Sequence, residues 1–226
     1  MIGPKVRVDL HCHTHRSSDC QTSYRALIAA CQRRGIDVLA VTDHNRIEGA
    51  LELADQKLPV RIIVGEEIKT TEGEIIGLFM RDFVPPRLSP EETIAEIKRQ
   101  GGVVYVPHPF DAVRRSVIKR EALERVAGSI DAIEVLNARL HSTERNQLAA
   151  RFATERGLLQ GAGSDAHTAL EVGRAGVEMP PFGDAASFKA ALRHATVFGK
   201  PSHPAVHLAS TFAKVRKKYL PGWRWI

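Results

Sequence analysis

Residues 6–19 read VRVDLHCHTHRSSD, and the character of this stretch changes at its middle. An apolar run of strand length comes first, and His11 and His13 end it at alternate positions. Side chains two residues apart in a strand point to the same face, so we expect both imidazoles to face inward, with Cys12 facing the surrounding core. His15 continues the alternation in the sequence only, because the chain has left the strand by then. The stretch predicts a first strand that ends in a pair of ligand-type side chains.

Strand-like apolar runs alternate with helical patterns along the rest of the chain, which is typical of repeated βα units and a mostly parallel sheet. Residues 69–79 break this rhythm with a Glu-Gly turn between two extended runs, and they predict a β-hairpin. Seven units favour a barrel, although an open doubly wound sheet gives the same local pattern. We expect strands at residues 6–11, 37–44, 60–67, 102–108, 131–137, 158–165 and 174–179, and helices within 23–35, 47–56, 89–101, 119–128 and 142–157.

The composition indicates a soluble protein with a sizeable core. Of the 226 residues, 43% are hydrophobic, and no apolar run approaches the roughly 18 residues that a membrane helix needs. Three cysteines without a CxxC pair argue against a disulfide framework and against a cysteine zinc site. The first residues lack the basic and apolar regions of a secretion signal. We therefore expect an unsecreted, cytoplasmic protein that does not contact a membrane.

The formal charge of +6 is concentrated at the end of the chain. Residues 205–226 contain five basic residues and no acidic ones, which leaves the preceding body close to neutral. We predict a barrel domain over residues 1–204 and a basic C-terminal tail over residues 205–226. Trp223 and Trp225 in that tail suit stacking on the bases of a nucleic acid, or alternatively packing on the outer wall of the barrel.

Side chains that bind metals or move protons follow six of the predicted strands. In α/β folds the carboxyl ends of the strands form one rim, where active sites are assembled. A core does not bury several histidines and carboxylates together without a cation that neutralises them. We therefore expect a metal-binding cluster at this rim, formed by side chains from the set His11, His13, Asp43, His44, Glu66, Glu67, His108, Asn137, Asp165 and His167.

The donor atoms indicate which ions the cluster takes. Imidazole and carboxylate ligands without clustered thiolates favour manganese, iron or zinc, whereas calcium and magnesium prefer all-oxygen sites. The candidate ligands are too many for one ion, and two or three ions that share bridging carboxylates fit the number.

The ordered motifs resemble those of the PHP (polymerase and histidinol phosphatase) metal-dependent phosphoesterases, especially the short stand-alone members. The matching pieces are DLHCHTHRSSD, VTDHN, the Gly-x-Glu of GEEI, HP in VPHPFD, and GSDAH, which together span residues 9–167. The resemblance implies an α/β fold, a distorted (β/α)7 barrel with two or three divalent metals, manganese above all, or iron or zinc. Adjacent strand residues point to opposite faces, so only one of Glu66 and Glu67 can readily face the centre of the rim. The Gly-x-Glu spacing favours Glu67 as the third-motif ligand.

Carried over position by position, the resemblance assigns the metal ligands. Where many relatives have a histidine in the hairpin strand, this sequence has Glu74, which we expect to act as a carboxylate substitute. Asn137 occupies another ligand position and is a weaker ligand. The implied ligands are His11, His13, Asp19, His44, Glu67, Glu74, His108, Asp165 and His167.

The implied activity is phosphoester hydrolysis by a metal-bound hydroxide, on a nucleotide, a bisphosphate, an oligonucleotide 5′ end or another phosphorylated small molecule. We predict two catalytic roles besides the ligands: Asp43 orients a ligand or shares in proton transfer, and Arg139 clamps a phosphate. One alternative is an amidohydrolase-type reaction at a carbon centre, with cleavage of a C–N bond. Another is a metal-binding accessory module without activity.

Overall fold

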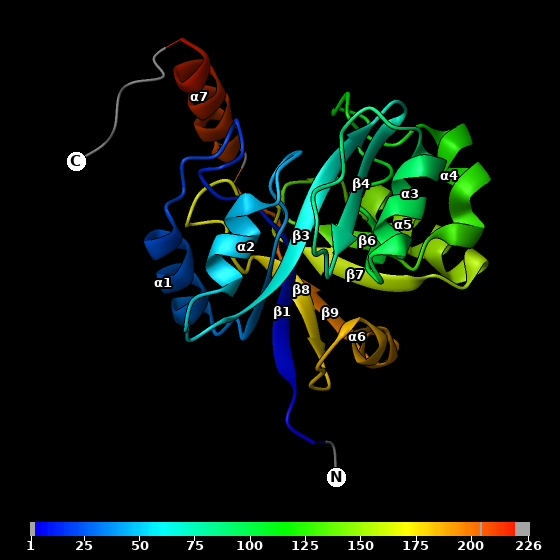
Figure 1. Ribbon diagram of the computed structural model, residues 1–226, viewed down its shortest axis with the longest axis horizontal. Helices are drawn as coiled ribbons and strands as arrows, with labels where there is room; N and C mark the ends of the chain where they lie inside the picture. Colours follow the sequence, from blue (N-terminus) through cyan, green and yellow to red (C-terminus); the bar gives the residue numbers. More distant parts are fainter. Residues whose placement is uncertain (1–2, 204, 220–226) are drawn as a thin grey trace.

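The computed structural model describes residues 3–203 and 205–219, in which nine strands form one strongly curved sheet. The sheet order is β7-β6-β5-β4-β3-β2-β1-β8-β9. A parallel bridge between Cys12 and Ala166 joins the end of β1 to the segment after β7, so the sheet nearly closes into a barrel (Figure 1). This confirms the predicted distorted barrel. The strands are β1 (Val6–Cys12), β2 (Val38–Val41), β3 (Arg61–Thr70), β4 (Gly73–Leu78), β5 (Val103–Val106), β6 (Ala132–Asn137), β7 (Leu159–Gly163), β8 (Ala175–Met179) and β9 (Thr196–Gly199).

The sheet is less parallel than the sequence pattern predicts. The pairs β1–β2, β2–β3, β5–β6 and β6–β7 are parallel, whereas β4 runs antiparallel to β3 and β5. The predicted strand at 174–179 forms as β8, but it pairs antiparallel to β1 and does not continue the parallel series. Strand β9 was not predicted, because its four residues are exposed or half-buried and carry no clear apolar alternation.

The predicted hairpin forms between β3 and β4, with Thr70 opposite Gly73 at its turn. Gly73 has a φ of +127°, a backbone conformation that L side chains rarely adopt. A Cβ atom at this position would lie 2.2 Å from the Cα of Ile118, which belongs to the loop after β5. The glycine therefore lets the hairpin turn and this loop lie against each other.

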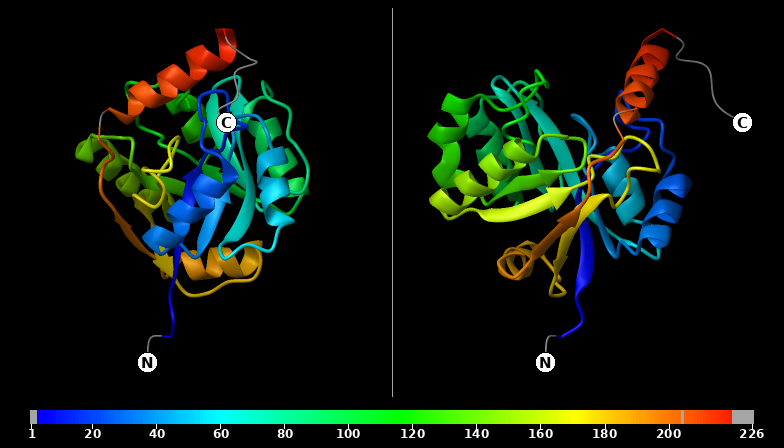
Figure 2. Two further views of the ribbon diagram at one scale, coloured as in Figure 1. Left: turned by 90° about the vertical axis from the view of Figure 1, so that its left-hand side faces the viewer. Right: turned by 180° about the vertical axis from the view of Figure 1, so that it is seen from behind.

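Five helices cover the outside of the barrel between successive strands, and each occurs where the sequence predicts one (Figure 2). Ser23, Ser89 and Ser142 cap the first, third and fifth of them by accepting hydrogen bonds from backbone N–H groups of the first turn. A further helix, α6 (Ala185–Leu192), lies at the amino-terminal end of the barrel strands. The five are α1 (Tyr24–Arg34), α2 (Glu48–Ala54), α3 (Pro90–Arg99), α4 (Arg120–Val126), which continues into a 3-10 turn (Ala127–Ser129), and α5 (Thr143–Arg156).

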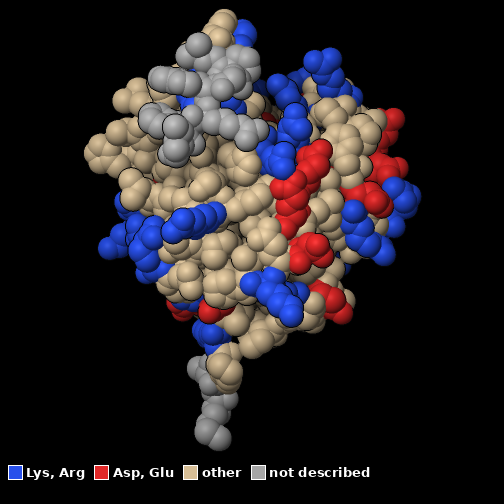
Figure 3. All heavy atoms as spheres, turned by 60° about the vertical axis from the view of Figure 1, so that its left-hand side comes forward, with Lys and Arg blue, Asp and Glu red and all other residues tan. Residues whose placement is uncertain are grey.

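The predicted tail contains a helix, α7 (Val206–Tyr219), which lies across the opposite end of the barrel from α6 (Figure 2). This is the end at which the parallel strands finish. Basic side chains gather at this end of the molecule, above a band of acidic ones (Figure 3). Trp223 and Trp225 lie outside the described residues.

Two strands carry an irregularity that aims side chains at the barrel interior. In β1 the register shifts between Asp9 and Cys12, and in β6 it shifts between Glu134 and Leu136. Each shift inserts an extra residue into one strand, and such a bulge redirects the side chains that follow it. Leu10 consequently packs in the core cluster formed by the strands and α6, while the next residue, His11, still reaches the cluster described below.

Candidate metal centre

Histidines and carboxylates from six segments meet at the carboxyl ends of the strands. Within each of four groups, the donor atoms all lie within 4.8 Å of one another. Neighbouring groups share members, so together they form one continuous cluster, which we call the rim cluster. The groups are His11–His13–Asp165, His13–His44–His167, His11–Glu67–His108 and His44–Glu67–Glu74.

The first two histidines of the chain face each other inside the rim cluster, with Nε2 of His11 3.2 Å from Nε2 of His13. Asp165 Oδ1 lies 3.6 Å and 3.4 Å from these two nitrogens, and Glu67 Oε2 lies 3.4 Å from each. All four side chains are buried. The arrangement places two nitrogen and two oxygen donors around one small space.

Asp19 joins the rim cluster from the loop after β1. Its carboxylate oxygens lie 3.5 Å from His44 Nε2 and 3.4 Å from His167 Nε2. His15 is exposed, and its ring packs against Tyr24 with the centroids 4.6 Å apart. The loop thus brings Asp19 into the cluster and leaves His15 outside it, as the sequence predicts.

Glu67 lies at the centre of the rim cluster, because it also approaches His44 Nδ1 at 2.9 Å and His108 Nε2 at 3.3 Å. Glu66 points to the other side of the strand and accepts a hydrogen bond from the backbone N–H of Val84. Burial raises the pKa of Glu66 to about 8. Glu74 enters from β4, with Oε1 3.9 Å from His44 Nδ1.

Several buried donor atoms of the rim cluster have no hydrogen-bond partner. These atoms are Asp19 Oδ1, Glu67 Oε2, His108 Nδ1 and Asp165 Oδ1. A buried polar atom without a partner is costly unless an ion or water satisfies it. Three of the four belong to carboxylates that face imidazole nitrogens, and this donor set suits divalent transition metals. The residues therefore fit the implied ions.

The electrostatics of the rim cluster show how strongly its members interact. Burial by itself lowers the pKa of His11, but the charges of Asp165, Glu134 and Glu67 raise the pKa well above its ordinary value. His13 behaves oppositely, since burial and the neighbouring His167 and His44 lower its pKa to about 3. The pKa values of the two imidazoles are thus shifted in opposite directions, although their Nε2 atoms lie 3.2 Å apart.

Burial alone would raise the pKa values of the cluster's carboxylates, and most of them are lowered instead. The neighbouring His167 and His44 hold the pKa of Asp19 far below its usual range, and the charges of His44 and His11 do the same for Glu67. Glu74 is the exception, because burial and the negative charge of Glu67 raise its pKa.

Two predicted ligands have a backbone conformation that is uncommon for residues with a side chain. The φ angles are +29° at His108 and +52° at Asp165. Such conformations persist only where the surrounding structure enforces them, and they concentrate at functional sites.

The predicted catalytic Asp43 contacts the loop after β1 and not the open end of the barrel. Its carboxylate accepts hydrogen bonds from the N–H and hydroxyl of Thr14, at 2.7 and 2.6 Å, and from the hydroxyl of Ser17, at 2.7 Å. Ser17 Oγ also lies 3.1 Å from His13 Nδ1. Asp43 therefore connects to His13 through the hydroxyl of Ser17.

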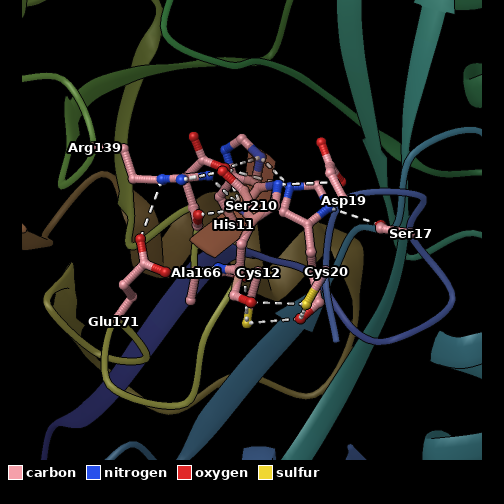
Figure 4. Close-up of polar contacts among 12 residues, drawn as sticks. His11, Cys12, Ser17, Asp19, Cys20, Arg139, Ala166, Glu171 and Ser210 are labelled. Atoms are coloured by element: carbon pink, nitrogen blue, oxygen red, sulfur yellow. Dashed lines mark hydrogen bonds and ion pairs between the residues drawn. The ribbon is translucent and has the colours of Figure 1, made fainter. Parts of the chain in front are cut away.

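The predicted clamp Arg139 is buried and contacts other side chains (Figure 4). Its Nη1 lies 2.7 Å from His167 Nδ1, and its Nε lies 3.1 Å from Glu171 Oε1. Nη2 donates to Ser210 Oγ at 2.8 Å. The guanidinium thus contacts His167, Glu171 and Ser210 through three different nitrogens.

Asn137 does not direct an oxygen at the rim cluster. Its amide nitrogen donates to Glu134 Oε2 at 2.8 Å and lies 3.2 Å from Asp165 Oδ2, while its oxygen accepts the backbone N–H of Arg139.

Two side chains at the site are not among the predicted ligands and catalytic residues. Glu134, buried in β6, lies 3.2 Å from His11 Nδ1 and accepts the backbone N–H of His108 at 2.8 Å. Arg114, from the loop after β5, places Nη1 2.5 Å from Asp165 Oδ2. A carboxylate in the middle of an apolar strand signals Glu134, whereas nothing in the sequence separates Arg114 from its basic neighbours.

Comparison with known proteins agrees with this geometry. The model of the PHP domain matches residues 9–164, and the model described as PHP-associated matches residues 143–197. The chain belongs to the PHP family. Its fold and the rim cluster are those expected of a divalent-metal-binding PHP protein, and its relatives support hydrolase activity in general.

Three relatives illustrate the family likeness. Uncharacterized protein MJ1587 of Methanocaldococcus jannaschii is 38% identical over 146 residues, which cover 59% of this chain and 82% of that protein. A probable phosphatase, YcdX of Escherichia coli, is 26% identical over 74% of this chain and 80% of its own length. The crystal structure of a two-domain Bacteroides vulgatus protein containing a predicted PHP-like metal-dependent phosphoesterase covers 93% of this chain and 70% of its own, with a TM-score of 0.67 and 19% identity. The last likeness shows the fold alone.

Among the described residues of this PHP chain, no helix combines the length and the apolar character that crossing a membrane requires.

Proposed function

We propose that the protein hydrolyses phosphate esters at the rim cluster, on a nucleotide, a bisphosphate or an oligonucleotide 5′ end. The observation that carries this proposal is the position of Arg114 beside the cluster. Its Nη1 contacts the predicted ligand Asp165, and its Nη2 is buried without a partner. A guanidinium that lies beside a metal cluster with an unpaired donor is suited to bind phosphate oxygens.

The loop after β5 is built to hold Arg114 in this position. The carboxylate of Asp111 accepts the backbone N–H groups of Val113 and Arg114, at 2.8 and 3.4 Å, and its other oxygen lies 3.1 Å from Arg114 Nε. The guanidinium is therefore fixed before a substrate arrives, which limits the entropy lost on binding.

In this proposal the rim cluster holds two or three divalent ions, of which manganese is the first choice and iron or zinc the others. His11, His13 and Asp165 would hold one ion, Asp19, His44 and His167 would hold another, and Glu67 would serve both, since it lies between the two groups. Glu74 and His108 complete the set. The bound ions supply the Lewis acidity and the activated water that phosphoester hydrolysis requires.

The remaining side chains orient this set. Glu134 accepts the Nδ1 proton of His11 and so leaves Nε2 free to bind metal. Asp43 positions His13 through the hydroxyl of Ser17, and Arg139 positions His167. Arg114 holds the phosphate of the substrate against the cluster and balances its negative charge.

A C–N hydrolase of the amidohydrolase type is the second candidate, since it also uses a barrel that begins with a His-x-His pair. The clustering of His44 and His167 with Asp19, together with Arg114, favours phosphate chemistry instead. A metal-binding accessory module without activity would use the same unpartnered donor atoms, and the absence of turnover on every substrate below would select it.

The proposal is tested with metal-free protein reconstituted with Mn²⁺, Fe²⁺ or Zn²⁺ in turn. Each form is assayed on p-nitrophenyl phosphate, bis-p-nitrophenyl phosphate, a nucleoside 3′,5′-bisphosphate and a 5′-phosphorylated oligoribonucleotide, with a cyclic amide as the C–N substrate. We expect phosphate release from at least one ester and none from protein carrying His11→Ala. Turnover of the amide alone would select the second candidate.

A further inference from the structure

Helix α7 contacts the loop after β1, which contains Asp19, and it also contacts Arg139 in the loop after β6. Arg139 in turn contacts His167, which lies in the loop after β7. The side chains of Asp19 and His167 lie 3.4 Å apart at the edge of the rim cluster. Figure 2 shows α7 at this end of the barrel in both views, and in the left view the helix runs across it.

The contacts of α7 with the first loop lie on both sides of Asp19. Lys217 Nζ donates to the backbone carbonyl of His15 at 2.6 Å and also to that of Ser17. Arg216 Nη1 donates to Gln21 Oε1 at 2.8 Å. Asp43 holds the inner side of this loop through Ser17, so Lys217 and Asp43 hold the loop from opposite sides.

Helix α7 is connected to the loop of His167 through Arg139. The guanidinium donates to Ser210 Oγ at 2.8 Å and to the carbonyl of Val206 at 3.3 Å. Its other end contacts His167 Nδ1 at 2.7 Å and Glu171 (Figure 4). One end of α7 therefore supports His167, and the other supports the loop of Asp19.

We propose that α7 is a brace for one part of the metal centre, in which Lys217 acts as a positioning residue for Asp19. The ligand loop contains turns and no helix or strand, so its carbonyl groups depend on individual hydrogen bonds, such as the one that Ser17 accepts from the N–H of Cys20. Lys217 satisfies two of these carbonyls and fixes the loop at the distance at which Asp19 meets His44 and His167. The brace stabilises this one group of ligands, while His11 and His108 of the His11–Glu67–His108 group contact Glu134 of β6.

The inference rests on the metal-binding part of the proposed function, and it does not depend on the substrate. Outer contacts of metal ligands typically change metal affinity by about 10- to 100-fold when they are removed. Because α7 supports only one ligand group, we expect the metal affinity to fall for one ion of the set.

Two substitutions in the full chain test the brace. Lys217→Met removes the donor to the loop, and Lys214→Met is the matched control, because Lys214 is an exposed lysine of the same helix. Metal-free proteins are titrated with Co²⁺, followed by absorption, and with Mn²⁺, followed by electron paramagnetic resonance. We expect Lys217→Met to bind one ion about 10- to 100-fold more weakly and the others unchanged. We expect Lys217→Arg to restore most of the affinity and Lys214→Met to match the unaltered protein.

Amide hydrogen exchange of the metal-free proteins provides a readout that needs no metal. We expect the amides of residues 14–21 to exchange faster in Lys217→Met than in Lys214→Met, with the strands unchanged. Ser210→Ala, which removes the other end of the brace, should weaken the same ion, and it replaces Lys217→Met if that variant does not fold. Isotherms that coincide for the Lys217 and Lys214 variants overturn the brace. If the protein binds its ions but hydrolyses no phosphate ester, the proposed function fails and the titrations still decide the brace.

Discussion

Glu134 Oε1 lies 3.2 Å from His11 Nδ1, and both side chains are buried at the bottom of the rim cluster. The contact spans 123 residues of sequence and joins the two strands whose register shifts. A carboxylate behind a metal-binding imidazole fixes which ring nitrogen carries the proton and makes the other a stronger ligand.

Glu134→Gln should therefore weaken metal binding while the protein stays folded. The amide keeps the shape of the side chain but loses the charge that favours the His11 Nδ1 proton. We expect metal affinity to fall by about 10- to 100-fold, measured by Co²⁺ titration. Glu155→Gln, an exposed change on α5, is the control and should bind like the unaltered protein. Equal metal affinities for the two variants would show that Glu134 does not support metal binding.

Arg114→Gln should reduce phosphoesterase activity through substrate binding. Losing a charge-assisted hydrogen bond costs about 1.5–3 kcal/mol, so we expect kcat/KM to fall by roughly 10- to 100-fold, mostly through KM. The neighbouring Arg115 is exposed, and Arg115→Gln is a control that removes the same charge from the loop. The two variants are compared by steady-state kinetics on the best ester and by competition with inorganic phosphate. A normal KM and normal phosphate inhibition in Arg114→Gln would show that this arginine does not hold the phosphate.

Metal binding should release protons near neutral pH. Burial lowers the pKa of His11 and of His44, but neighbouring carboxylates raise both pKa values well above the ordinary value. These shifts favour the cationic form, with both ring nitrogens protonated, in the metal-free protein. An ion must displace these protons, and the apparent metal affinity should therefore rise as the pH rises. Titration calorimetry in two buffers with different ionisation enthalpies measures the release directly. A binding enthalpy that is the same in both buffers would exclude it.

Gly73→Ala should destabilise the barrel next to the site. The new Cβ atom would meet the backbone of Ile118 at a φ that L residues rarely adopt. We expect a loss of roughly 2 kcal/mol or more in the free energy of unfolding, measured by denaturant titration of the metal-free protein. Gly128→Ala is the matched change, because nothing lies within 4 Å of its added Cβ. If both variants unfold at the same denaturant concentration, the close approach of hairpin and loop is unimportant.

The sequence predicts those parts of the site that follow from local pattern. His11, His13 and Glu67 lie at or near the ends of buried strands, and their faces follow from strand alternation and motif spacing. The bulge in β1 was not predictable, because an extra residue in a strand depends on its pairing partner.

Long-range contacts account for what the sequence did not reveal. The antiparallel pairing of β8 depends on which strand edge is free, and the contacts of Arg139 depend on α7. Arg114 resembles its basic neighbours until the Asp111 turn places it beside Asp165. Such relationships arise only when the barrel closes.

The central claim is that the rim cluster is a metal centre for phosphoester hydrolysis. The most direct measurement compares the rate of phosphate release by the metal-free protein, the Mn²⁺-reconstituted protein and reconstituted Asp165→Asn. We predict hydrolysis by the reconstituted protein alone, with the other two at background. Equal rates for all three would contradict the claim.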